Sequence, residues 1–326
     1  MPKFTLAGCG ALVIGLVSIA QAFLSDGVAP DLSGGRRWDA APRMSGSMER
    51  SLDGGLRWNM EGGSFDNFRS LFTWQGSEPA TQDFSDAIFT SFDAWSAVDP
   101  NLATAGPLAF VHDPLTPVVF DTIVSLGAEI DLFAGDTGHG AGVTGGLTFL
   151  KGVPGMVTLT SGTTDYASNV IAGVDIRLNN IPGTNWTLPL FQKVLTHEIG
   201  HALGLNDVEL ANGSFIDDNY DGSSETAANA TLTNEFSHLI NVVDPSQSLG
   251  LSFFDVPNTV LGLEASNVHI LMESAIDLEQ LGALTADEFA GRQFLYPIPE
   301  PTLGLLFLVG GMWLIHQRRL EISDHC

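Results

Sequence analysis

Residues 197–207 constrain the fold of this chain more than any other segment. They read His-Glu-Ile-Gly-His-Ala-Leu-Gly-Leu-Asn-Asp. Positions i and i+4 of an α-helix project from one face, a turn apart, so a helix here turns the rings of His197 and His201 toward one point. Gly204 can take the left-handed conformation that ends a helix, and the chain can then bring Asp207 back toward the two rings. The segment predicts a helix, a tight turn and three converging side chains.

Three such side chains are suited to a zinc ion. Imidazole nitrogens and carboxylate oxygens bind zinc at about 2.0 to 2.2 Å, and three protein ligands leave the fourth position open for water, as in catalytic sites. Zinc lowers the pKa of that water to about 7. Glu198 follows His197 on the helix, where it can reach the water, accept its proton and deliver it to a leaving amine. We expect His197, His201 and Asp207 to bind zinc and Glu198 to act as the general base.

The spacing resembles the signature of the metzincin clan of zinc peptidases, His-Glu-x-x-His-x-x-Gly-x-x-His. Asp207 stands in place of the last histidine, a departure that some metzincin relatives share. The resemblance implies a methionine-containing turn beneath the metal. Residues 270–274 read Ile-Leu-Met-Glu-Ser and offer Met272 for this turn. The alternative role for Met272 is plain filling of the core, which is common for methionine.

The order of the other segments resembles the matrixin-like branch of that clan. Residues 92–96 resemble its first helix, residues 173–178 the strand before the active-site helix, and residues 284–296 the closing helix. The similarity spans residues 55–297 and implies an α/β (α+β) zincin fold, with a twisted mixed sheet, an active-site helix and a C-terminal helix. It also implies a secreted zinc-dependent endopeptidase, whose protein or peptide substrate lies extended along an edge strand.

Apolar periodicity indicates a helix early in the chain. Residues 82–98 place four apolar side chains at spacings of three and four, which is the pattern of a helix with one buried stripe. These side chains are Phe84, Ile88, Phe92 and Trp95.

The remaining periodic segments predict two more helices and a sheet. Residues 188–203 show a helical pattern around the two histidines, and a last helix is expected between Leu284 and Pro297, with Glu288 placed to cap its start. Glycines between positions 138 and 146 indicate a long loop. Strands are expected at 108–112, 129–133, 173–178 and, as a weaker candidate for the substrate-binding edge, 156–160.

The beginning of the chain has the features of an export signal. Residues 1–22 combine Lys3, an apolar run and a final Ala-Gln-Ala, which is typical of a secretory signal peptide. The alternative is a lipoprotein signal with lipid attached to Cys9, although little apolar sequence precedes that cysteine. Residues 23–55, rich in glycine, serine and arginine toward their end, are interpreted as a flexible leader or pro-segment.

The end of the chain, residues 298–326, contains Pro-Glu-Pro, an apolar stretch at 303–315 and a basic pair at 318–319. This order resembles the PEP-CTERM sorting signal of Gram-negative bacteria. The resemblance implies a transient membrane tether that an exosortase-type enzyme cuts, and a protein that is secreted or at the cell surface. The stretch is shorter than the about 20 residues of a spanning helix, so the alternatives are a weak membrane anchor or a buried helix end.

Two further metal sites are considered. The catalytic domain is expected at 56–297 with an insertion at about 208–268, in which Asp217, Asn219 and Asp221 alternate like the oxygen ligands of a calcium loop. The alternative is a solvated acidic turn, and a full EF-hand is excluded because alanine stands where the bidentate glutamate belongs.

His139, close to Asp136 in the glycine-rich loop, is a candidate ligand of a second, structural metal. Its alternative is an ordinary exposed histidine. The two cysteines lie at positions 9 and 326, so we expect the domain to be held by its core and by metal without disulfides.

The net charge of −25 argues against nucleic acid or an anionic membrane surface as a partner. The main alternative function is a non-catalytic extracellular matrix or adhesion protein with a structural metal site. Glu198 argues against this alternative, because a structural site needs no base.

Overall fold

A computed structural model describes a central part of the chain. It covers residues 24–25, 36–99, 104–105, 108–120, 126–162, 166–207, 271–272, 284 and 286–297. The predicted signal at 1–22, the tail at 298–326, the insertion and the calcium candidates Asp217, Asn219 and Asp221 lie outside these residues. Within the described part, no helix has the length and apolar character needed to cross a lipid bilayer.

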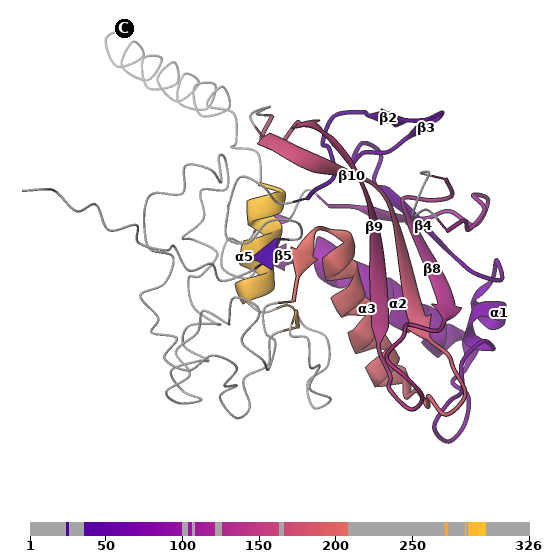
Figure 1. Ribbon diagram of the computed structural model, residues 1–326. Helices are drawn as coiled ribbons and strands as arrows, with labels where there is room; N and C mark the ends of the chain where they lie inside the picture. Colours follow the sequence, from indigo (N-terminus) through magenta and orange to yellow (C-terminus); the bar gives the residue numbers. More distant parts are fainter. Residues whose placement is uncertain are drawn as a thin grey trace, which may run out of the picture.

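One five-stranded, mixed sheet organises the domain (Figure 1). The strands follow the order β7 (Phe110–His112), β4 (Leu56–Met60), β8 (Ile130–Gly135), β10 (Tyr166–Asn179) and β9 (Gly146–Val157). β9 runs antiparallel to β10, whereas the other neighbouring pairs are parallel. The predicted combination of helices with a mixed sheet is therefore confirmed.

The predicted strands agree with the sheet to different degrees. The segments 108–112, 129–133 and 173–178 fall on β7, β8 and β10. Only Met156 and Val157 of the candidate edge segment 156–160 belong to a strand, at the far end of β9. The inner strand β4 was not predicted, although Leu56, Trp58 and Met60 alternate with polar residues and are fully or almost fully buried.

Two long helices, α2 (Thr81–Ser96) and α3 (Leu188–Ala202), pack against each other on the same face of the sheet (Figure 1). Their bounds confirm the predicted helices at 82–98 and 188–203 within two residues. The side chain of Thr187 accepts a hydrogen bond from the Leu190 amide and thereby caps the start of α3. The smaller helices are α1 (Phe65–Arg69) and α5 (Ala286–Leu295), and α5 confirms the expected last helix.

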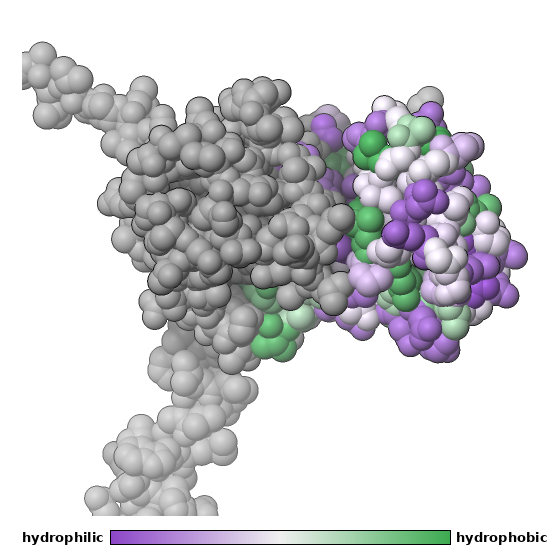
Figure 2. Space-filling view, turned by 90° about the horizontal axis from the view of Figure 1, so that it is seen from below, coloured by the Kyte–Doolittle hydropathy of each residue, from purple (hydrophilic) through white to green (hydrophobic). Residues whose placement is uncertain are grey.

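The core lies between the sheet and these two helices. The predicted stripe on α2 is buried, because Phe84, Ile88, Phe92 and Trp95 are each at most 1% exposed. Phe92 stacks on Trp58 of β4 with the ring centroids 4.6 Å apart. The outer surface seen in Figure 2 is mostly polar, with apolar residues in small separate patches. The burial thus follows the amphipathic pattern of the sequence.

Residues 36–55 pack against this core. Arg37 and Trp38 are at most 1% exposed, and Arg37 forms a parallel bridge with Val170 of β10. Arg50 is also buried and donates a hydrogen bond to the carbonyl of Gly127 at 2.9 Å. Two short hairpin strands, β2 (Met44–Ser45) and β3 (Met48–Glu49), lie in the same segment. Removal of residues 23–55 as a leader stays a prediction, but their second half is part of the packed domain.

Four more two-residue strands complete the described elements. β1 (Leu24–Ser25) pairs with β11 (Leu205–Asn206), and β5 (Val98–Asp99) pairs with β6 (Thr104–Ala105). β11 follows the end of α3 directly, so it connects the helix to Asp207.

Candidate metal centre

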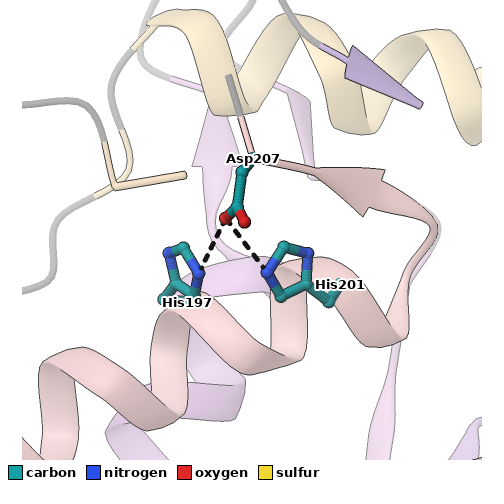
Figure 3. Close-up of side chains that lie close together, drawn as sticks. All are labelled: His197, His201 and Asp207. Atoms are coloured by element: carbon teal, nitrogen blue, oxygen red, sulfur yellow. Dashed lines mark ion pairs between the residues drawn. The ribbon is translucent and has the colours of Figure 1, made fainter. Parts of the chain in front are cut away.

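His197, His201 and Asp207 converge on one point (Figure 3). The Asp207 Oδ1 atom lies 3.2 Å from Nε2 of His197 and 3.3 Å from Nε2 of His201. One ligand atom of each residue lies within 4.8 Å of the other two, and this is the one such group of histidine, cysteine or acidic side chains among the described residues. The three predicted metal ligands are thus brought together.

Helix geometry and a glycine turn build this arrangement. His197 and His201 stand one turn apart on α3, with ring centroids 4.6 Å apart and the planes perpendicular. Gly204 has a φ of +99° and ends the helix, as its position in the sequence predicts. A Cβ atom at this position would also overlap the carbonyl oxygen of Arg36. Glycine is therefore required at position 204 for two reasons: it allows the turn toward Asp207, and it leaves space for the backbone carbonyl of Arg36.

Two backbone carbonyls fix the tautomers of the histidines. His197 Nδ1 lies 2.7 Å from the carbonyl oxygen of Leu271, and His201 Nδ1 lies 2.9 Å from that of Leu205. A carbonyl oxygen can only accept, so each Nδ1 carries a proton and the Nε2 of a neutral ring presents its lone pair to the centre. Metal-binding histidines are usually oriented by such a contact.

The atoms that face the centre of the cluster are suited to a positive charge. Asp207 Oδ1 is buried and lacks a well-aligned hydrogen bond, and its contacts with an imidazole become an ion pair only when that ring is protonated. Burial raises the pKa of Asp207, but the imidazoles of His197 and His201 outweigh burial and hold this pKa well below its usual range. Burial lowers the pKa of His201, but Asp207, Glu198 and the Leu205 carbonyl outweigh it and raise this pKa to about 9. Three inward-facing acceptors of this kind can take up either a proton or a metal ion.

Glu198 is buried beside this group, on the side of β9. Its Oε2 atom accepts a hydrogen bond from the Thr148 hydroxyl at 2.7 Å. Gly146 lies on the same strand, and a Cβ atom there would overlap the Glu198 carboxylate. No sequence signal pointed to Thr148 or Gly146, because their contact with α3 depends on strand register.

Met272 lies against α3 close to the C-terminal end of the helix. Its side chain is 1% exposed, and a Cβ atom at Gly200 would overlap its sulfur atom. The amides of Leu271 and Met272 both donate to the same Glu288 oxygen, at 2.7 and 3.1 Å. Glu288, whose position in the sequence predicts a helix cap, thus positions the segment whose Leu271 carbonyl holds His197.

The glycine-rich loop does not bring a second ligand group together. Asp136 accepts a hydrogen bond from the Gly138 amide, and His139 Nε2 lies 3.2 Å from the carbonyl oxygen of Gly146. In the described part of the chain, neither residue belongs to a group of three metal ligands. The suggested second metal site thus has no complete ligand set there.

Compared with known proteins, the chain matches no protein-family model and no curated protein sequence.

Proposed function

We propose that this chain is a secreted zinc-dependent endopeptidase with a metzincin-like, matrixin-like fold. The observation that carries the proposal is the convergence of two Nε2 atoms and one buried carboxylate oxygen, with both rings held by carbonyls at Nδ1. Two imidazoles and one carboxylate suit zinc, and three protein ligands are typical of its catalytic sites. The residues present therefore fit this metal.

The arrangement of the elements supports the proposed fold. The sheet has a single antiparallel strand at its edge, β9, and this strand packs against α3, which carries the histidines. Met272 lies against Gly200 between the two histidines of the same helix. These features agree with what the metzincin resemblance implies for the active-site helix and the methionine turn.

The proposed reaction is hydrolysis of a peptide bond. Bound zinc would supply Lewis acidity that polarises the carbonyl and acidifies the attacking water. Glu198 accepts a proton from that water and then gives it to the nitrogen of the leaving amine. The carbon–oxygen bond forms first, the carbon–nitrogen bond breaks once the nitrogen has received the proton, and the products are a carboxylic acid and an amine. The burial of Glu198 beside the cluster supports this role, because the proton would be transferred in a site protected from bulk water.

The edge strand offers a place for the substrate. An extended peptide can add to the free edge of a sheet through backbone hydrogen bonds. Residues 156–160, the earlier candidate, are covered there, because the Ala40 amide donates to the Thr158 carbonyl at 2.9 Å and Arg43 donates to the Met156 carbonyl. The beginning of β9, at Gly146 and Thr148, instead lies beside Glu198. We therefore assign substrate binding to the beginning of β9.

The remaining parts of the proposal concern export and partners. Residues 1–22 would direct export, and residues 298–326 would form a PEP-CTERM signal cut by an exosortase-type enzyme. The protein would then act outside the cell or on its surface, with a protein or peptide as its substrate and calcium as an additional ligand near Asp217, Asn219 and Asp221. Cleavage of the tail in a strain with and without an exosortase tests this part, because unchanged mass in both strains would contradict it.

Digestion of a peptide library, read by mass spectrometry, tests the enzymatic proposal. The wild type should cleave peptides, and removal of the metal with a chelator should abolish cleavage. Glu198→Ala should lower kcat by about 100- to 10,000-fold, the usual contribution of a general base, while zinc content stays the same. Asp93→Ala, an exposed acidic position on α2, is the matched control and should retain full activity. A wild type that binds zinc but cleaves nothing would favour the non-catalytic matrix or adhesion protein.

A further inference from the structure

The Glu198 carboxylate is held from outside its own helix. Thr148 of β9 donates its hydroxyl proton to Glu198 Oε2 at 2.7 Å. The same hydroxyl oxygen lies 3.1 Å from the Glu198 backbone carbonyl. A threonine hydroxyl has only one proton to donate, and a bond to an ionised carboxylate is stronger than a bond to a neutral carbonyl. The contact with Oε2 is therefore the dominant one.

The other carboxylate oxygen, Oε1, lies next to Gly146, a residue of the same strand that has no side chain. Residues two apart on a strand project to the same side, so Gly146 and Thr148 both face Glu198. A Cβ atom at Gly146 would overlap Cγ, Cδ and Oε1 of Glu198. Among the described residues, no hydrogen bond is made to Oε1. β9 thus holds Oε2 by a hydrogen bond and accommodates Oε1 only because residue 146 has no side chain.

Thr148 is a rigid support for this contact. It pairs with Ile176 of β10, and β10 is itself paired with β8 on its other side. A β-branched side chain such as threonine has few accessible χ1 rotamers, so its hydroxyl is held in direction as well as in position. A glutamate side chain has several rotatable bonds, and without this bond it would sample more than one rotamer.

We propose that Thr148 is a positioning residue for the general base: it holds Oε2 in one place and thereby leaves Oε1 as the oxygen that accepts and returns the proton. This inference rests on the proposed function. In the reaction, the O–H bond of the attacking water breaks as an O–H bond forms at Oε1. That bond then breaks in turn when the proton moves to the nitrogen of the leaving amine. Thr148 itself exchanges no proton with the substrate.

Two substitutions separate the hydroxyl from the shape of the side chain. Thr148→Val removes the hydroxyl and keeps the volume, whereas Thr148→Ser keeps the hydroxyl. We expect Thr148→Val to lower kcat by about 10- to 100-fold, the size of one hydrogen bond to a charged group, with KM changed by less than about twofold. Thr148→Ser should recover kcat to within about threefold of the wild type. Zinc content should be the same in all three proteins.

The matched control is a second threonine whose hydroxyl donates to a carboxylate. Thr116 donates to the Asp113 carboxylate at 2.5 Å, in a loop that contributes nothing to the metal centre. Thr116→Val removes an equivalent hydroxyl–carboxylate bond and should leave kcat and KM unchanged. If Thr116→Val lowers kcat as much as Thr148→Val, the loss comes from general destabilisation and the inference is overturned.

A crystallographic measurement provides a readout that does not depend on activity. In Thr148→Val, the Glu198 side chain should occupy more than one rotamer, while the wild type and Thr148→Ser show one. A single unchanged rotamer in Thr148→Val, or full kcat in that variant, would overturn the inference. If the wild type cleaves no peptide, the proposed function fails, and the rotamers of Glu198 still decide whether Thr148 positions it.

Discussion

Trp38 tests whether residues 36–55 belong to the folded domain. Its side chain is 1% exposed, and its indole Nε1 donates to the carbonyl oxygen of Ala202 at 2.9 Å, at the end of α3. Truncating a buried aromatic side chain to alanine costs about 3 to 5 kcal/mol, because apolar contacts are lost and a cavity remains. Trp38→Phe keeps most of the apolar area but leaves the carbonyl without its indole donor, which costs about 1 to 3 kcal/mol.

Urea unfolding of the metal-free protein measures both effects, since bound metal would add its own stabilisation. We expect the free energy of unfolding to fall by about 3 to 5 kcal/mol for Trp38→Ala and by about 1 to 3 kcal/mol for Trp38→Phe. The control is Met44→Ala in the same segment, whose side chain is 64% exposed and whose loss should change stability by less than about 0.5 kcal/mol. If Trp38→Ala is as mild as Met44→Ala, residues 36–55 are not part of the domain core.

Three shorter predictions concern the metal centre and its supports. Because the pKa of His201 is raised to about 9, this ring is charged at pH 7 without metal, and zinc uptake should release about one proton from it. Zinc affinity should therefore rise with pH up to about 9 and then level off. Calorimetry in two buffers of different ionisation enthalpy measures the proton release. No release at pH 7 would contradict this prediction. Tyr296→Phe removes a buried hydroxyl that donates to the Leu203 carbonyl at 2.6 Å. The free energy of unfolding in urea should therefore fall by about 1 to 3 kcal/mol, and an unchanged value would contradict this prediction. Gly200→Ala introduces a Cβ that overlaps the Met272 sulfur, and the overpacking cost of about 1 to 3 kcal/mol should exceed the gain in helix propensity of up to about 1 kcal/mol. A more stable Gly200→Ala protein in the same unfolding assay would show that Met272 does not pack there.

Local features of the sequence accounted for the helices and for the convergence of His197, His201 and Asp207. The buried stripe of α2 follows from apolar spacing alone, and the two histidines of α3 meet because a helical turn brings positions i and i+4 together. Gly204 made the return of Asp207 predictable, since its positive φ requires a residue without a side chain. These interactions join residues that are close in the sequence.

Contacts between distant segments could not be predicted in the same way. Thr148 and Glu198 are 50 residues apart, and their meeting depends on how β9 is paired with β10. The Leu271 carbonyl that orients His197 is 74 residues away from it. Strand register and the packing of connecting segments decide such contacts, and one residue of slip would turn Thr148 to the other face of the sheet.

The segment before β4 shows that composition alone also fails to predict packing. Its glycine, serine and arginine content indicated a flexible leader, because such residues are common in unstructured chain. In the structure, Trp38 and Arg50 nevertheless reach buried carbonyl acceptors at Ala202 and Gly127. Composition describes the average of the segment, whereas a few large side chains determine where it packs.

The zinc content of the purified protein tests the central claim most directly. Inductively coupled plasma mass spectrometry should find about one zinc ion per chain in the wild type and in Glu198→Ala, which keeps all three ligands. His201→Ala should lose most of this zinc, since it removes one of the three converging atoms. A wild type without stoichiometric zinc or another transition metal, or a His201→Ala protein that retains it fully, would contradict the assignment of His197, His201 and Asp207 as a metal site.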